Sequence, residues 1–215
     1  MTLLSIPGDK VKDWLEGLCF FLLGFIGALI VGWFLFPMAL YSEHTQPINF
    51  DHAIHLENVE GDTLTEKCLY CHEFYEDGTF AGIPRIEKCE DCHDPESPLG
   101  DSLEEKKFLT KYLAQGKEIP WYHYYKQPPC VYFPHISHVK MAKIACKTCH
   151  GNHGTSEFLP VYQENRISGY SRNIWGKHIS GYKEHSWDRM KMDDCAECHT
   201  KKGHEEYNSC FTCHK

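Results

Sequence analysis

Positive charge is scarce in this sequence, which has 22 Lys and Arg against 30 Asp and Glu and a formal net charge of −8. Residues 42–215 carry 20 basic and 27 acidic side chains. Nucleic-acid-binding domains are basic, so this balance argues against a nucleic-acid partner.

Charge is absent altogether from Gly17 to Tyr41, a run of 25 residues. About 20 apolar residues span a bilayer as a helix, so this run is long enough for a transmembrane anchor. It exceeds a typical signal-peptide core, and no small-x-small cleavage site precedes Ser42. We therefore expect an uncleaved anchor over 17–41, after a short segment 1–16. A cleavable signal peptide is the alternative.

Cysteine is abundant, and ten of the twelve cysteines belong to five copies of Cys-x-x-Cys-His. This signature attaches a c-type haem: two thiols bond covalently to the haem and the adjacent histidine ligates the iron. In chain order the copies, motifs 1 to 5, are Cys68-Leu-Tyr-Cys71-His72, Cys89-Glu-Asp-Cys92-His93, Cys146-Lys-Thr-Cys149-His150, Cys195-Ala-Glu-Cys198-His199 and Cys210-Phe-Thr-Cys213-His214. The chain is thus identified as a multihaem cytochrome c with five haems.

Haem attachment also predicts the topology. Because c-type haem is assembled outside the cytoplasm, residues after Tyr41 should be periplasmic, with 1–16 cytoplasmic and the helix in the inner membrane. An acidic periplasmic domain is suited to steering a basic soluble redox protein. The alternative is that its charge only keeps the domain soluble.

The chain is also short for the number of haems, with about 35 residues per haem after Tyr41. Haem faces must then replace much of an aliphatic core. We expect a mainly α fold with little regular structure, in which short helices carry the motifs and haem stacking builds the domain.

A repeat divides this region. Phe50-Asp-His52-Ala-Ile-His55 precedes motif 1, and Phe133-Pro-His135-Ile-Ser-His138 precedes motif 3. We predict a first haem module over 42–95, a connector over 96–129 and a second module over 130–215. In the connector, Ser102-Leu-Glu-Glu105 is a capping-box pattern that opens a helix, and Gly116 is a natural stop.

Ten histidines remain after the five proximal ligands His72, His93, His150, His199 and His214. The i, i+3 spacing of His52/His55 and of His135/His138 puts both rings of each pair on one helical face. His204, between motifs 4 and 5, and His153, just after motif 3, are further distal candidates. Candidates with less support from their sequence context are His123, His178, His185 and Met192. A methionine ligand such as Met192 would raise the haem potential. His44 is expected at the membrane interface.

Two cysteines lie outside the motifs. Cys19 falls in the apolar run and is read as a small buried residue. Cys130 is either a packed free thiol or a single-thioether anchor for a sixth haem, although no histidine follows it.

The repeat resembles that of class III cytochromes, in which the first histidine of such a pair ligates the haem of the next motif and the second ligates another haem. This resemblance implies that His52 faces the haem of His72, and His135 that of His150.

Longer strings resemble the pentahaem cytochrome subunit of alternative complex III. They include Ala81-Gly-Ile-Pro84, Gly116-Lys-Glu-Ile-Pro-Trp121, Val131-Tyr-Phe-Pro-His135 and Cys146-Lys-Thr-Cys-His-Gly151. The likeness is closer still to the multihaem subunit of the Qrc-type menaquinone reductases. It implies integral-membrane and iron–sulfur partner subunits, a soluble periplasmic tetrahaem cytochrome c as donor, and electron delivery to menaquinone. The sequence departs from the complex III pattern at Tyr125, where a histidine is expected, and at Cys130.

Three other functions are alternatives. In the complex III role, electrons run from quinol to a soluble acceptor. A small anchored tetrahaem quinol dehydrogenase places a haem near the membrane helix, whereas motif 1 begins 27 residues after Tyr41. A catalytic reductase of nitrite type would need an open iron position, and none of the five motifs is altered. We therefore expect no catalytic site in this chain.

Overall fold

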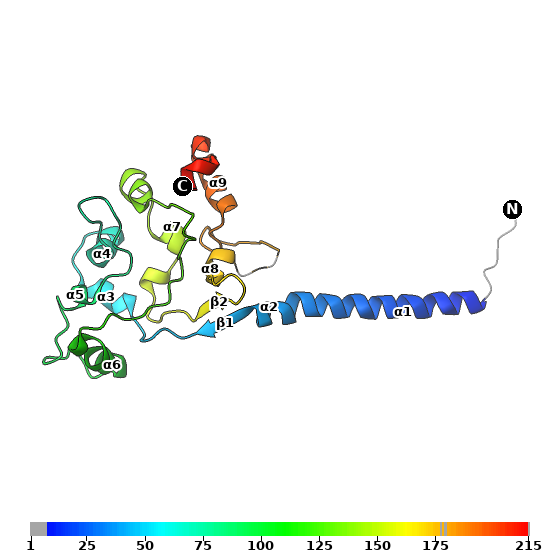
Figure 1. Cartoon of the computed structure of the whole chain (residues 1–215), viewed down its shortest axis with the longest axis horizontal. Coiled ribbons are helices and arrows are strands. Elements are labelled where there is room, and N and C mark those ends of the chain that lie inside the picture. Colours follow the sequence, from blue (N-terminus) through cyan, green and yellow to red (C-terminus); the bar gives the residue numbers. More distant parts are fainter. Residues whose placement is uncertain (1–7, 177, 179, 215) are drawn as a thin grey trace.

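The computed structural model describes residues 8–176, 178 and 180–214. Part of the expected cytoplasmic segment, residues 1–7, lies outside the described residues. The main features are one long amino-terminal helix and a domain of short helices and loops (Figure 1).

The long helix projects from the domain as a rod. It comprises α1 (Gly8–Ile30), the π-helical turn η1 (Val31–Leu35) and α2 (Phe36–Leu40), so it contains residues 17–40 of the expected anchor. Pro37 lacks the N–H that would bond to the carbonyl four residues earlier, which accounts for the irregular turn. The helix is long and apolar enough to cross a membrane, a description that a signal sequence also fits.

A two-stranded sheet joins this helix to the domain. Strand β1 (Tyr41–His44) pairs antiparallel with β2 (Tyr162–Asn165), with Tyr41 opposite Asn165 and His44 opposite Tyr162. The segment that follows the long helix is therefore hydrogen bonded to the carboxy-terminal half of the protein.

The domain consists of short elements, none longer than ten described residues. The α-helices are α3 (His52–Asn58), α4 (Leu64–Cys71), α5 (Ile86–Cys89), α6 (Leu103–Lys111), α7 (Lys147–His150), α8 (Arg172–Trp175), α9 (Met192–Lys201) and α10 (Cys210–Cys213). The other helical turns are η2 (Leu113–Gln115), η3 (Ser137–Met141), η4 (His153–Thr155) and η5 (Glu205–Asn208). This agrees with the mainly helical fold that the sequence predicts; haem stacking stays a prediction.

Helix α6 forms as its sequence predicts. The Ser102 hydroxyl accepts a hydrogen bond from the Glu105 N–H at 3.0 Å, and Gly116 ends the following turn at φ 56°. The Glu105 carboxylate, however, bonds to His93.

The hydrophobic core is small. Its buried residues are Ile48, Ile86, Phe108, Leu109, Tyr112 and Leu113, and it packs beneath α6. Among the described residues, no large side chain is less than 2% exposed. Cys89 packs against this core, which thus supports motif 2.

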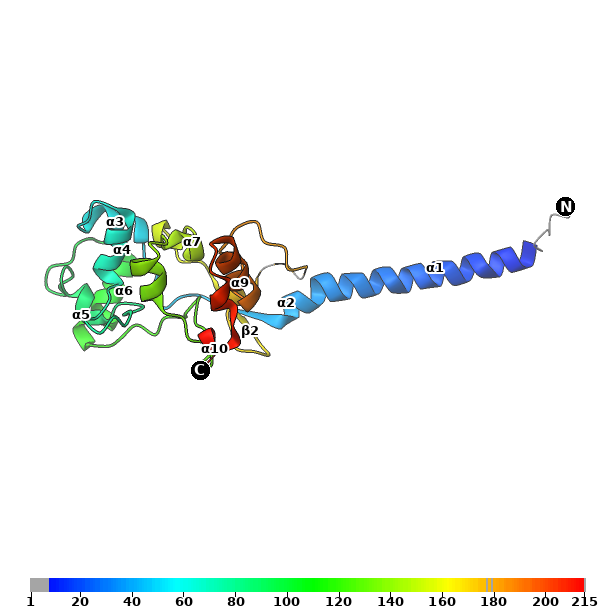
Figure 2. The ribbon, with the colours of Figure 1, turned by 90° about the horizontal axis from the view of Figure 1, so that it is seen from above.

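The motifs follow the long axis of the molecule. Helices α3 to α6 lie at the end away from the long helix, α7 lies in the middle, and α8 and α9 lie near β2 and α2 (Figures 1 and 2).

Candidate haem centres

Each attachment motif lies in or at the end of a helix. The N–H of the motif histidine donates to the carbonyl of the first cysteine, four residues earlier, at 2.9 to 3.0 Å in motifs 1, 2, 3 and 5. Motif 4 lies inside α9. Residues three and four apart share a helix face, so both thiols and the imidazole project together. All twelve cysteines are free thiols, as attachment requires.

The Phe-x-His-x-x-His repeat has the same geometry in both copies. Phe50 lies edge-on to His52, with ring centres 4.7 Å apart, and parallel to His55 at 4.1 Å. In the second copy Phe133 lies edge-on to His135 at 4.9 Å and parallel to His138 at 4.4 Å. The repeat is therefore a structural unit that holds two imidazoles against one phenyl ring.

Three pairs of histidine rings stand at a separation that suits haem iron. The ring centres are 6.2 Å apart for His55 and His93, 6.4 Å for His135 and His150, and 6.2 Å for His138 and His199. Two imidazoles on opposite sides of one iron stand about 6 Å apart, because a metal–nitrogen bond is about 2 Å. In each pair, one ring belongs to an attachment motif and the other to the repeat.

Hydrogen bonds fix the orientation of many of these rings. Nδ1 faces a backbone carbonyl in His55 (Asp51), His72 (Gly82), His138 (Pro134) and His214 (Cys130), and a side-chain oxygen in His93 (Glu105) and His199 (Asn208). An imidazole that donates from Nδ1 has its Nε2 lone pair free for a metal. The donor set therefore fits haem iron.

A fourth cluster surrounds His72. The His52 and His153 rings are 5.6 Å apart, and both interact electrostatically with His72. Burial, helped by His153, lowers the pKa of His52 to about 4. The His52 Nδ1 is buried without a hydrogen-bond partner. His52 and His153 thus both lie near motif 1, and both are candidates for its distal ligand.

The motifs lie next to one another in the order 2, 1, 3, 4, 5. Lys88 of the second motif's helix lies over the Tyr70 ring of motif 1, at 4.3 Å. The neighbouring Cys146 raises the pKa of the Cys68 thiol, which places motif 3 beside motif 1. Burial raises the pKa of the Cys195 thiol to about 11, and the nearby Cys149 and Cys213 add to the shift, which places motif 4 near motifs 3 and 5. Motifs 2, 1, 3 and 4 thus succeed one another along the domain, and motif 5, in α10, lies beside motif 4 (Figure 2).

The remaining candidates lie outside these pairs. His204 is exposed, bonds to Glu206 at 3.1 Å and stacks on Tyr207 beside His199 rather than His214. The other distal candidates are also exposed: His123, His178, His185 and Met192. His44 follows the long helix and packs against Tyr122 at 5.1 Å. Cys19 is exposed on the long helix.

Cys130 lies beside motif 5. Its thiol is exposed, and its carbonyl faces the His214 Nδ1 at 3.2 Å, next to a bridge between Val131 and His214. The backbone at Cys130 thereby orients a motif histidine. Whether its thiol holds a sixth haem stays a prediction.

Several residues that hold the histidines were not identified from sequence: Phe80, Gly82, Glu105, Tyr125 and Asn208. Tyr125 meets the His150 ring edge-on at 4.6 Å. For Phe80 a signal exists, because Asp77-Gly78 marks a tight turn between two phenylalanines. The contacts themselves join segments far apart in sequence.

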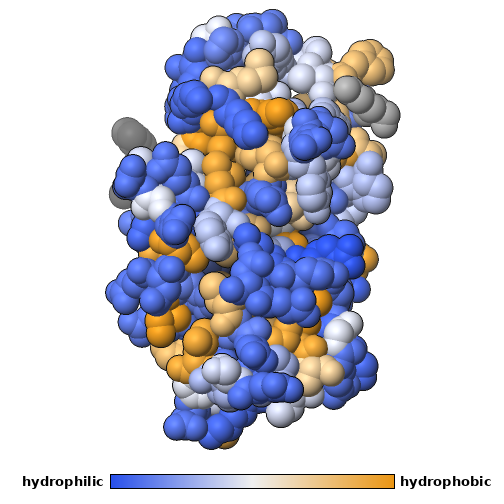
Figure 3. Space-filling view, turned by 90° about the vertical axis from the view of Figure 1, so that its left-hand side faces the viewer, coloured by the Kyte–Doolittle hydropathy of each residue, from blue (hydrophilic) through white to orange (hydrophobic). Residues whose placement is uncertain are grey.

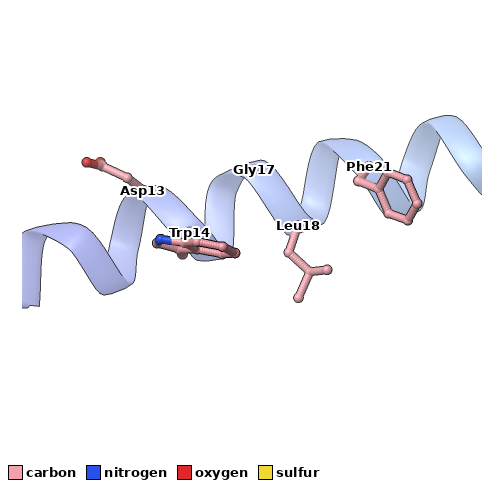
Figure 4. Close-up of a pocket in the computed structure, with 5 residues that line it drawn as sticks. All are labelled: Asp13, Trp14, Gly17, Leu18 and Phe21. Atoms are coloured by element: carbon pink, nitrogen blue, oxygen red, sulfur yellow. The ribbon is translucent and has the colours of Figure 1, made fainter. Parts of the chain in front are cut away.

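The surface depressions differ in how close they lie to the haem-attachment motifs. One is lined by Asp13, Trp14, Gly17, Leu18 and Phe21 on the lone helix α1, far from the motifs (Figure 4). Another, of about 300 Å³, opens beside the Cys71 thiol between motifs 1 and 2. Among the described residues, no three or more His, Cys, Asp or Glu are grouped to hold a bare metal ion.

No protein-family model matches the chain. It is 34% identical over 208 residues to the menaquinone reductase, multiheme cytochrome c subunit, of Nitratidesulfovibrio vulgaris (strain Hildenborough). The alignment covers 91% of this chain and 89% of that protein.

Proposed function

The chain belongs to the family of menaquinone reductase multihaem cytochrome c subunits, and from this premise we propose that it conducts electrons toward menaquinone. Its donor is a soluble periplasmic cytochrome c, and its acceptors are iron–sulfur and integral-membrane partner subunits. Haem c supplies reversible one-electron chemistry when bound. The residues of this chain attach the haems, ligate the irons and fix the imidazole orientations.

The closeness of each of the five motifs to the next is the observation that carries this proposal. Because neighbouring motifs lie close together, haems attached there would form one continuous series. We assign His55, His135 and His138 as the distal ligands opposite His93, His150 and His199. His52 is assigned opposite His72 by analogy with His135, with His153 as the alternative.

The charge distribution supports a soluble donor at the end that carries motif 2. Residues 42–95 contain 13 Asp and Glu against three Lys and Arg, whereas residues 130–215 contain nine against 12. The acidic module lies at the end away from the long helix, and that end face is largely hydrophilic (Figure 3). An acidic surface accelerates the approach of a basic partner.

Reduction rates test the donor assignment. We expect the triple variant Glu60→Gln, Glu76→Gln, Glu90→Gln to be reduced several-fold more slowly by a basic tetrahaem cytochrome at low salt. These three carboxylates are exposed in the first module. The matched control Glu157→Gln, Glu184→Gln, Asp193→Asn removes the same charge from the second module and should leave the rate unchanged.

Stopped-flow mixing over a range of ionic strengths provides the measurement. The wild-type rate should fall as salt rises, because the Debye length is about 8 Å at physiological ionic strength. Equal rates for both triple variants would refute docking at the first module.

Haem potentials distinguish the proposed direction from the complex III role. Potentials below that of menaquinone support menaquinone reduction, and potentials above it favour oxidation of quinol. A potentiometric titration of the isolated complex therefore decides between the two.

We further propose that the long helix is a retained, single-pass inner-membrane anchor with its amino terminus in the cytoplasm. Its large apolar side chains are exposed from Trp14 to Met38, with Phe20 75% and Leu23 68% exposed. A lipid phase or partner helices would cover them.

A further inference from the structure

A short turn of the first module inserts against the second. Phe74 and Phe80 form an antiparallel bridge, closed by a hydrogen bond from the Tyr75 N–H to the Thr79 carbonyl at 2.8 Å. Gly78 at its tip has φ +84°, and a Cβ there would come within 2.8 Å of Ile136. The turn is thus held tightly against the helical segment that carries His135 and His138.

Phe80 lies between histidines of the two modules. Its ring is parallel to the His135 ring, with centres 4.3 Å apart, and to the His72 ring at 6.4 Å. The interplanar angles are 23° and 21°. Two residues later, the Gly82 carbonyl accepts the hydrogen bond from His72 Nδ1. One loop therefore contacts a motif 1 ligand and the candidate distal ligand of motif 3.

The two histidines of the second repeat are held differently. The His138 ring has Phe133 on its face and the Pro134 carbonyl on its Nδ1, at 3.0 Å. For His135, no described residue hydrogen bonds to the ring, and Phe133 meets it only edge-on. The face of His135 is covered by Phe80 instead.

We infer that Phe80 is a positioning residue at the crossing between the two haem modules, where it sets the plane of the His135 imidazole. This inference rests on the proposed function, because it takes His135 as an iron ligand. The phenyl ring restricts rotation of the imidazole and keeps water from it. Solvent exposure and the apolar shell around a haem tune its potential.

The test compares Phe80→Leu with Phe80→Tyr, which keeps the ring, and with Phe158→Leu, which shortens an exposed phenylalanine (71% exposed). Each variant is prepared in the intact complex. Haem content, electron paramagnetic resonance of the ferric haems and a potentiometric titration are measured on the same samples.

For Phe80→Leu we expect one low-spin ferric signal to shift and one midpoint potential to fall, since water stabilises the more highly charged ferric state. Phe80→Tyr and Phe158→Leu should match the wild type. A haem lost from Phe80→Leu alone also supports the inference, because the retained ring of Phe80→Tyr prevents that loss.

Wild-type signals and potentials in Phe80→Leu, or equal changes in Phe80→Leu and Phe80→Tyr, would overturn the role of the ring. Wild-type protein without low-spin haem would refute the proposed function itself, which separates the two failures.

Discussion

The Glu105 carboxylate accepts a hydrogen bond from His93 Nδ1 at 3.1 Å, and both side chains are largely buried, at 13% and 17% exposure. Phe108, one turn along α6, meets the same imidazole edge-on at 5.2 Å. The connector helix thus supports motif 2 directly. A carboxylate on Nδ1 makes an imidazole a stronger electron donor to a metal.

We expect Glu105→Gln to raise one haem midpoint potential, because a weaker donor imidazole stabilises ferric iron less. Glu96→Gln, which removes an exposed carboxylate from the same region, should change no potential. Potentiometric titration followed by absorbance provides the measurement. An unchanged potential in Glu105→Gln would show that this carboxylate does not tune the haem of motif 2.

Removing a distal ligand should change the spin state of one haem. We expect His138→Ala to convert one low-spin ferric haem to high spin, because His199 alone would remain on that iron. His178→Ala, at an exposed histidine, should leave the spectrum unchanged. Electron paramagnetic resonance makes the comparison, and a purely low-spin His138→Ala protein would contradict the assignment.

An ion cluster holds the start of α9. Arg189 donates to Asp194 from Nη2 at 2.8 Å and from Nε at 2.9 and 3.2 Å, and Lys183 donates to the same carboxylate at 2.9 Å. Burial alone would raise the pKa of Asp194, but these bonds outweigh it and lower that pKa to about 2. We expect Asp194→Asn to reduce the free energy of unfolding by about 2 kcal/mol at neutral pH.

The sign of the pH dependence follows from the lowered pKa. The carboxylate of Asp194 stabilises the fold above its ordinary pKa of 3.8, and this contribution is lost as pH falls from 3.8 toward 2. The stability difference between wild type and Asp194→Asn should therefore shrink in that window, as thermal unfolding can measure. The neighbouring exposed Asp193→Asn serves as control, and a constant difference across the window would contradict the account.

Mass spectrometry tests the anchor and the haem count together. We expect the mature chain to include residues 1–41 and to carry at least five covalent haems, with no change in haem content in Cys130→Ser. A mature amino terminus near Ser42 would refute the anchor. A haem lost in Cys130→Ser would instead establish a sixth attachment site.

Local pattern was enough to predict much of this molecule. Three features depend on residues within a few positions of one another. They are the five motifs, the two closely spaced histidine pairs (His52 with His55 and His135 with His138), and the start of α6 at Ser102. The same holds for the apolar helix.

The order of the motifs in space could not be predicted, because it depends on contacts between distant segments. The β1–β2 pairing joins Ser42 to Glu164, and Phe80 packs on His135. Individually weak packing interactions decide such contacts, and a single sequence leaves no local trace of them.

The most direct test of the central claim is rapid mixing of a reduced periplasmic tetrahaem cytochrome with the isolated, menaquinone-containing complex. The account predicts that the haems of this chain become reduced first and are then reoxidised as menaquinol forms. Haems that menaquinol reduces, and that pass electrons to the oxidised soluble cytochrome, would contradict it.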